Sequence, residues 1–134
     1  MQIIEAIESD YKFITGRDRH INEQLVESKI KNGEIYILVE ENIRIGWMRF
    51  GYFWDNLPFM NMLWLDEEYR GQGFGKKVVE HWEEKMKNKG FNQVMTSTQA
   101  NEGAQHFYRK LGYKDVGCLL LENEPLEILM AKKL

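Results

Sequence analysis

The segment from residue 63 to residue 77 carries the residue types whose spacing points most directly to chemistry. An apolar run passes through an acidic turn into three glycines spaced two apart, Gly71, Gly73 and Gly75, and an amphipathic stretch follows. A strand that ends at such a turn and begins a helix leaves backbone N–H groups without intrahelical partners, at the positive end of the helix dipole. Glycine lets a ligand approach that backbone closely. The pattern therefore predicts a phosphate-binding turn.

Two nucleotide-binding patterns fail on spacing. The dinucleotide fingerprint requires a glycine three positions after Gly73, where Lys76 stands. The Walker loop requires Ser or Thr after Gly-Lys, but Lys77 follows Lys76 and offers no hydroxyl to magnesium. The remaining pattern is Arg70-x-x-Gly73-x-Gly75, which a plain strand-to-helix turn could also contain.

The turn needs a strand before it and a helix after it, and the apolar periodicity predicts both. The predicted strands cover residues 2–7, 34–41, 43–54, 59–65, 91–98, 113–121 and 126–131. The predicted helices cover residues 10–17, 22–32, 74–89 and 101–111. Because a strand, a helix and a strand follow one another from residue 59 to residue 98, these two strands are expected to pair in parallel.

The hairpin before the turn is rich in aromatic residues: Trp47, Phe50, Tyr52, Phe53, Trp54, Phe59 and Trp64. Most are expected to form the core of a sheet covered on both faces, while some could line an acceptor pocket. Gly46 and Gly51 interrupt the strand pattern and predict a bulge or a close backbone approach. In the helix after the turn, Glu83 is placed on the charged face, four residues before Lys87. The link at residues 17–21 is a candidate substrate rim.

A second segment, residues 101–113, turns the glycine pattern into a specific resemblance. It contains Asn101, Ala104, a Phe-Tyr pair ending at Tyr108, and Leu-Gly-Tyr ending at Tyr113. This succession resembles the second motif of the GNAT acyltransferases. The Arg70-x-x-Gly73-x-Gly75 turn resembles their Arg/Gln-x-x-Gly-x-Gly/Ala signature, which grips the pyrophosphate of coenzyme A. The element order agrees, so the resemblance covers essentially the whole chain.

The resemblance implies a mixed α/β (α+β) GNAT fold, with a central mixed sheet of six or seven strands flanked by about four helices, in one domain over residues 1–134. It implies transfer of an acetyl group from acetyl-CoA, a cosubstrate, to a primary amine of a small molecule, peptide or protein by direct attack in a ternary complex. The alternative is a non-catalytic acyl-CoA-binding sensor or regulatory module. Because many members dimerise through their C-terminal strands, a homodimer is also implied.

The resemblance also assigns cofactor-binding positions. In the family, the strand before the turn splays from its parallel neighbour, and its free backbone groups bind the pantetheine arm and acyl carbonyl. Here these positions are Leu63, Trp64 and Leu65. The pyrophosphate positions are Arg70, Gly71, Gln72, Gly73, Phe74, Gly75 and Lys76, where Arg70 and Lys76 could add positive charge. Asn101 is expected to contact the cofactor arm and to cap its own helix.

Tyr108 matches the general acid of the family. A phenol has a pKa near 10 and a thiol near 8.5, so full proton transfer to the leaving thiolate is uphill by roughly 2 kcal/mol. Tyr108 is therefore expected to donate a hydrogen bond to the thiolate, with transfer completed through water. Some members carry a carboxylate base where Thr96 stands here. Asp55 is the speculative base, Glu102 is another candidate, and a water chain ordered by backbone groups and Thr96 is a third option.

Composition excludes other classes of function. The chain has a formal net charge of −3 and no basic block longer than two residues, which argues against binding to nucleic acid. Its one cysteine, Cys118, and three scattered histidines show no metal-ligand spacing, so no metal is expected. The apolar run at residues 118–121 is far short of the roughly 20 residues of a membrane span. No signal peptide is recognisable, and the predicted location is cytoplasmic.

Overall fold

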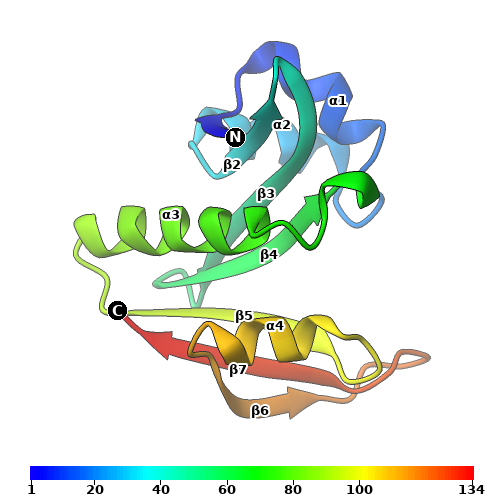
Figure 1. Ribbon diagram of the computed structural model, residues 1–134. Helices are drawn as coiled ribbons and strands as arrows, with labels where there is room; N and C mark the ends of the chain where they lie inside the picture. Colours follow the sequence, from blue (N-terminus) through cyan, green and yellow to red (C-terminus); the bar gives the residue numbers. More distant parts are fainter. The chain divides into compact units, whose positions relative to one another are not determined.

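The computed structural model describes all of residues 1–134, and its elements follow the predicted order (Figure 1). The strands are β1 (Gln2–Glu5), β2 (Ile35–Glu40), β3 (Ile43–Phe53), β4 (Leu57–Leu65), β5 (Gln93–Gln99), β6 (Lys114–Leu119) and β7 (Glu127–Lys133). The α-helices are α1 (Tyr11–Thr15), α2 (Glu23–Lys31), α3 (Phe74–Asn88) and α4 (Ala104–Lys110), and the 3-10 helices are η1 (Glu8–Asp10) and η2 (Glu67–Tyr69). The strands form a mixed seven-stranded sheet in the order β1-β2-β3-β4-β5-β7-β6. The predicted sheet and its four helices are confirmed.

Two compact units make up the chain. The first holds residues 1–50 and 62–79, and the second holds residues 51–61 and 80–134. The boundaries fall inside β3, β4 and α3, so each of these elements begins in one unit and ends in the other. The single domain expected from the sequence stays a prediction. None of the helices is both long and apolar enough to span a lipid bilayer.

In the first unit, α1 and α2 pack on antiparallel strands. β2 pairs with both β1 and β3 in antiparallel fashion. Apolar side chains from both helices and from the strands form the core cluster: Ala6, Ile14, Val26, Ile35, Ile37 and Trp47. The start of α2 is as predicted, because Asn22 Oδ1 accepts a hydrogen bond from the Gln24 N–H at 2.7 Å.

Gly46 explains the irregular course of β3. The register between β2 and β3 shifts by one residue next to the pair Leu38–Gly46, which is a bulge. A Cβ at Gly46 would lie only 2.1 Å from the carbonyl oxygen of Trp64. The bulge and the close backbone approach expected at this glycine are therefore both confirmed. The close approach involves the C-terminal end of β4, which precedes the glycine-rich segment.

In the second unit, β4 and β5 pair in parallel as predicted. The register joins Phe59 to Met95 and Met60 to Thr96. β7 lies between β5 and β6 and is antiparallel to both. α4 runs along β5 (Figure 1). β6 is the edge strand of the sheet, and all six of its residues are exposed.

The expectation that most hairpin aromatics belong to the core is wrong. Of the seven, only Trp47 and Phe50 are buried, while Trp64 is 43% exposed and Trp54 is 84% exposed. Trp54 and Asp55 have positive φ and form the tip of the β3–β4 hairpin, so the side chain of Trp54 lies beyond the sheet. Aromatic composition alone does not separate a buried strand from its exposed end.

The apolar face of α3 is as predicted, but its charged face contains one error. Val78, Val79, Trp82 and Met86 are fully buried. Glu83, expected in solvent beside Lys87, is only 8% exposed. It accepts hydrogen bonds from Tyr113, in the loop after α4, and from Lys132 of β7, which explains how a carboxylate can be buried here.

Candidate active site

The glycine turn in the first unit has the features of an anion-binding site. Gly71 and Gly73 have φ values of +73° and +83°, a region that favours glycine, and a Cβ at either position would meet no atom within 4 Å. The hydrogen bond from the Lys77 N–H to the Gly73 carbonyl, at 3.2 Å, begins the α3 ladder. The N–H groups of Phe74 and Gly75, in the first turn of the helix, therefore have no intrahelical acceptor. Donors and open space coincide, as a phosphate group requires.

Two polar side chains tie this turn to the elements before it. Arg70 Nε donates to the Leu65 carbonyl at 2.8 Å, and its guanidinium lies 4.5 Å from the centre of the Trp64 ring. Gln72 Nε2 donates to the Glu68 carbonyl at 2.9 Å. The charge of Arg70 is therefore held at the end of β4, next to the glycine turn, while the Gln72 amide is engaged with η2.

Trp64 connects the end of β4 with the link between α1 and α2. Its ring stacks on Trp47, with centroids 6.0 Å apart and planes at 28°. Trp47 Nε1 donates to Asp18 Oδ2 at 3.1 Å, and Arg49 Nε donates to the same oxygen at 2.7 Å. Burial acts to raise the pKa of Asp18, but the hydrogen bonds and the charge of Arg49 lower the pKa below its usual value. The candidate substrate rim is thus anchored by a charged carboxylate.

Tyr108 lies in the second unit, on α4, and its phenol is almost fully buried. The hydroxyl lies 4.0 Å from Met60 Sδ. Thr96 Oγ1 donates to the Met60 carbonyl at 3.0 Å, at the position where β4 and β5 pair. Burial raises the pKa of Tyr108 to about 12, with the Thr96 hydroxyl opposing and Glu102 adding to the shift. The phenol is therefore protonated at neutral pH and lies beside the β4–β5 contact.

Asn101 lies before α4 but does not cap it. The N-cap of α4 is Gly103, without a side-chain hydrogen bond to the helix, so the predicted capping role of Asn101 is wrong. The chain first makes a turn in which the Glu102 N–H donates to the Gln99 carbonyl at 3.0 Å, and the helix begins only after it. Asn101 is exposed.

Asp55 lies at the exposed tip of the β3–β4 hairpin, with a φ of +59°. From Leu57, where β4 begins, to Met60, which contacts Tyr108, the strand spans about 10 Å. This separation within the second unit counts against direct proton abstraction by Asp55 from an amine that lies at Tyr108.

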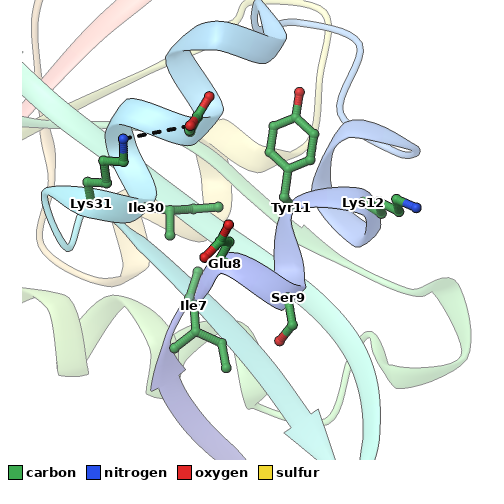
Figure 2. A pocket seen from close by; sticks show the side chains of 9 residues that line it. Ile7, Glu8, Ser9, Tyr11, Lys12, Ile30 and Lys31 are labelled. Atoms are coloured by element: carbon green, nitrogen blue, oxygen red, sulfur yellow. Dashed lines mark ion pairs between the residues drawn. The ribbon is translucent and has the colours of Figure 1, made fainter.

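A hollow of about 800 Å³ lies elsewhere in the first unit, among η1, α1 and α2 (Figure 2). Its lining combines apolar Ile7 and Ile30 with charged residues, and the Glu27–Lys31 ion pair at 3.7 Å lies at its edge. None of the residues predicted to bind cofactor or to act in catalysis lines it.

Comparison with known proteins decides the family. A sequence model of the "Acetyltransferase (GNAT) family" matches residues 2–113, which include both the glycine turn and the segment around Tyr108. The chain belongs to the GNAT acetyltransferase family. The resemblance drawn from the two motifs is confirmed by this match, and so is the fold.

Three similar proteins are informative about this GNAT chain. N-alpha-acetyltransferase 30 of Schizosaccharomyces pombe is 38% identical over 56 residues, which are 41% of this chain and only 37% of the relative. A structure of the NatC complex bound to Gag peptide and CoA has a TM-score of 0.80 at 20% identity, over 100% of this chain and 99% of the other. A putative streptothricin acetyltransferase of Bacillus anthracis, in complex with acetyl coenzyme A, has a TM-score of 0.69 at 25% identity, over 75% and 61%.

Sequence reasoning located the GNAT motifs but missed the residues that support them. Arg49 gives a sequence signal, because a charge inside a strand of buried apolar residues normally has a buried partner. That partner, Asp18, lies 31 positions away, and the pairing is a tertiary contact. Glu83 gives no such signal, since its spacing fits the solvent face of an amphipathic helix.

Proposed function

We propose that this GNAT protein transfers an acetyl group from acetyl-CoA to a primary amine, by direct attack of the amine on the thioester. The observation that carries the proposal is that both family motifs have the local structure their chemistry needs. The turn before α3 combines open space at Gly71 and Gly73 with the first N–H groups of the helix, those of Phe74 and Gly75, and Tyr108 offers a buried, protonated phenol. A protein that only bound acyl-CoA would have no need of the buried phenol.

The cofactor positions follow from the same motifs. In the proposal, the backbone of Gly71 to Lys76 binds the pyrophosphate, and Arg70 supplies charge from its position on Trp64. The backbone of Leu63 to Leu65 binds the pantetheine arm and the acyl carbonyl, and Asn101 contacts the arm. The positive φ values of Gly71 and Gly73 and the space above them support this assignment.

The role proposed for Tyr108 is donation of a hydrogen bond. The amine nitrogen forms a bond to the carbonyl carbon, the C–S bond breaks, and the sulfur keeps the electron pair as a thiolate. With a phenol pKa of about 12 and a thiol pKa near 8.5, full proton transfer from Tyr108 would cost about 5 kcal/mol. Tyr108 therefore stabilises the thiolate while the proton reaches the sulfur through water.

The position of Thr96 favours an acceptor that needs little help to lose a proton. The Thr96 hydroxyl donates to the Met60 carbonyl and has no basic group to offer. At pH 7.5 about a third of a peptide α-amine is neutral, against about 0.1% of a lysine side chain. We therefore propose the α-amine of a peptide or protein as the acceptor, which agrees with the name of the relative N-alpha-acetyltransferase 30. The buried Thr98 hydroxyl, which has no hydrogen-bond partner, supports an ordered water as the proton acceptor. Asp55 stays the alternative base.

An acetylation assay tests the proposal. Thiol release from acetyl-CoA is measured with a panel of peptides that differ at the first residue, with the same peptides blocked at the α-amine, and with lysine derivatives and small amines. We expect amine-dependent thiol release with the free α-amines and a product whose mass shows one added acetyl group. Binding of CoA without release by any amine would instead support the sensor or regulatory module.

We also propose that the protein forms a homodimer through β6. This edge strand is exposed over its whole length, and the apolar residues on and after it are Val116, Leu119, Leu120 and Leu121. An exposed apolar edge is suited to pairing with a second sheet edge. Light scattering after size-exclusion chromatography should give the mass of two chains for the natural protein and of one chain for Val116→Asp with Leu120→Asp. Ile43→Asp, which changes an apolar residue exposed in the first unit, should keep the dimer. A monomeric natural protein would contradict the proposal.

A further inference from the structure

A buried polar cluster in the second unit, which the proposed chemistry does not use, joins α3, β7 and the loop between α4 and β6. Glu83 of α3 accepts a hydrogen bond from the Tyr113 hydroxyl at 2.8 Å and another from Lys132 Nζ of β7 at 2.9 Å. Glu83 is 8% exposed and Tyr113 is 2% exposed. Burial, followed by the charge of Glu83, raises the pKa of Tyr113 well above its ordinary value, so its hydroxyl keeps the proton that it donates.

Tyr113 contacts Tyr108 through both its ring and its backbone. The two rings meet edge to face, with centroids 5.6 Å apart and planes at 68°. The Tyr113 N–H donates to the Tyr108 carbonyl at 3.1 Å. Between them, Gly112 has a φ of +96°, which turns the chain back at the end of α4, and a Cβ there would lie 3.4 Å from the Lys132 side chain. The position of Tyr113 therefore limits where the Tyr108 ring can lie.

Stability alone does not require a carboxylate at this position. A buried carboxylate loses its hydration and is tolerated only when it is paired and hydrogen-bonded. Replacing a buried ion pair by apolar side chains of similar size often leaves the stability of the folded protein unchanged or higher. What the carboxylate adds is direction, because one oxygen accepts from the Tyr113 hydroxyl while the other accepts from Lys132 Nζ of β7. The Tyr113 ring is thereby held in one orientation by a bond at its far end, opposite the backbone that carries it.

We propose that Glu83 is a positioning residue for Tyr108 and acts through Tyr113. By fixing the Tyr113 ring, it fixes the edge-to-face neighbour of the phenol that donates to the leaving thiolate. This inference rests on the proposed role of Tyr108. It concerns geometry: among charged groups, Glu102 and not Glu83 contributes to the shifted pKa of Tyr108.

The test measures kcat and KM for acetyl-CoA in Tyr113→Phe, Glu83→Ala and Glu83→Gln. Tyr113→Phe and Glu83→Ala should lower kcat about tenfold or more, because a small misplacement of a catalytic group has effects of this order. KM for acetyl-CoA should stay within about twofold, since binding resides in the glycine turn. Glu83→Gln keeps an acceptor for the Tyr113 hydroxyl and should retain more activity than Glu83→Ala, so it also tests the idea if Glu83→Ala folds poorly.

The matched control is Asp115→Asn. It weakens the exposed pair in which Arg109 binds Asp115 at 2.9 Å, which joins α4 to β6 without a bond to Tyr113. Its kcat should stay within about twofold of the natural protein, as expected for an exposed ion pair.

A double-mutant cycle separates positioning from general structural damage. In a Tyr108→Phe background, Tyr113→Phe should cost no further kcat, because the hydroxyl that it positions is gone. The same loss in both backgrounds, or an unchanged kcat in Tyr113→Phe, would overturn the inference. Failure of the proposed function looks different: Tyr108→Phe itself would then keep the kcat of the natural protein.

Discussion

Among single residues, the buried phenol of Tyr108 makes a prediction that does not depend on catalysis. Its pKa is about 12 in the folded chain and near 10 when unfolded. The folded state thus holds this proton more tightly, so the contribution of Tyr108 to stability is complete below pH 10 and is lost as the pH rises toward 12. Between these values the free energy of unfolding of Tyr108→Phe should fall by about 2 kcal/mol less than that of the natural protein. Denaturant titrations at both pH values measure the difference, and equal falls would show that the phenol is not held neutral.

What the sequence could predict for single residues depended on how local the signal was. Tyr108 was predictable because its motif lies within thirteen consecutive residues, and its partners Thr96 and Met60 follow from one strand pairing. Glu83 was not predictable, because its partners are 30 and 49 positions away and its own spacing fits a solvated helix face. The sequence allowed Trp64 to be either a core residue or part of a pocket. The structure shows that its side chain is exposed and that its ring stacks on Trp47.

For the elements, the glycine turn at the start of α3 can be compared with the glycine at its end. Gly73 and Gly90 both have positive φ, and a Cβ at either meets no atom within 4 Å. Replacement by Ala should therefore cost similar stability at both, about 1–2 kcal/mol. Only Gly73→Ala places a methyl group where the pyrophosphate is proposed to bind, so it alone should raise KM for acetyl-CoA, by about tenfold, or about 1.4 kcal/mol of lost binding. Equal KM values in the two variants would refute the assigned turn.

The contact between β3 and β4 gives a second prediction for the elements. A Cβ at Gly46 would lie 2.1 Å from the Trp64 carbonyl oxygen, whereas a Cβ at Gly117 would meet only a Leu129 methyl group at 3.9 Å. Gly46→Ala should lower the free energy of unfolding by about 1–3 kcal/mol, because β4 must shift. It should also raise KM for acetyl-CoA, since the shifted residues are those proposed to bind the acyl arm. Gly117→Ala should change stability by less than about 0.5 kcal/mol, and thermal unfolding of both variants checks this.

Element order and most element ends were predictable because turns and caps are local. Asn22 caps α2, and Gly33, Gly90 and Gly112 follow their helices with positive φ, as their residue types suggest. Asn101 shows the limit of this reasoning. A good N-cap residue was available three positions before α4, but the intervening turn placed Gly103 at the cap instead.

In the whole molecule, the two units share three continuous elements, and this predicts cooperative unfolding. Because β3, β4 and α3 each begin in one unit and end in the other, neither unit can unfold without interrupting a strand or helix in mid-length. Tryptophan fluorescence and far-ultraviolet circular dichroism should therefore give one coincident thermal transition, in keeping with the single domain expected from the sequence. Trp47 and Trp64 report on the first unit, and Trp54 and Trp82 on the second. Two separate transitions would show independent domains.

The family could be recognised from sequence because two short motifs stand in the right order along the chain, and the match over residues 2–113 agrees. The acceptor substrate could not be predicted from sequence. The acetyl donor is recognised by backbone groups and a glycine turn, whereas a pocket for the acceptor substrate is assembled from side chains distant in sequence. Asp18, Trp47 and Arg49, which anchor the link after α1, illustrate this: they are brought together only by the fold.

The catalytic role of Tyr108 is tested by amine-dependent thiol release from acetyl-CoA, measured at saturating concentrations of both substrates for the natural protein and for Tyr108→Phe. We expect kcat to fall about 100-fold or more in the variant, as is usual for loss of a proton donor to a leaving group. Thermal stabilisation by CoA should be the same in both, because the phosphate turn is intact. An unchanged kcat in Tyr108→Phe would contradict the central claim that this phenol stabilises the departing thiolate.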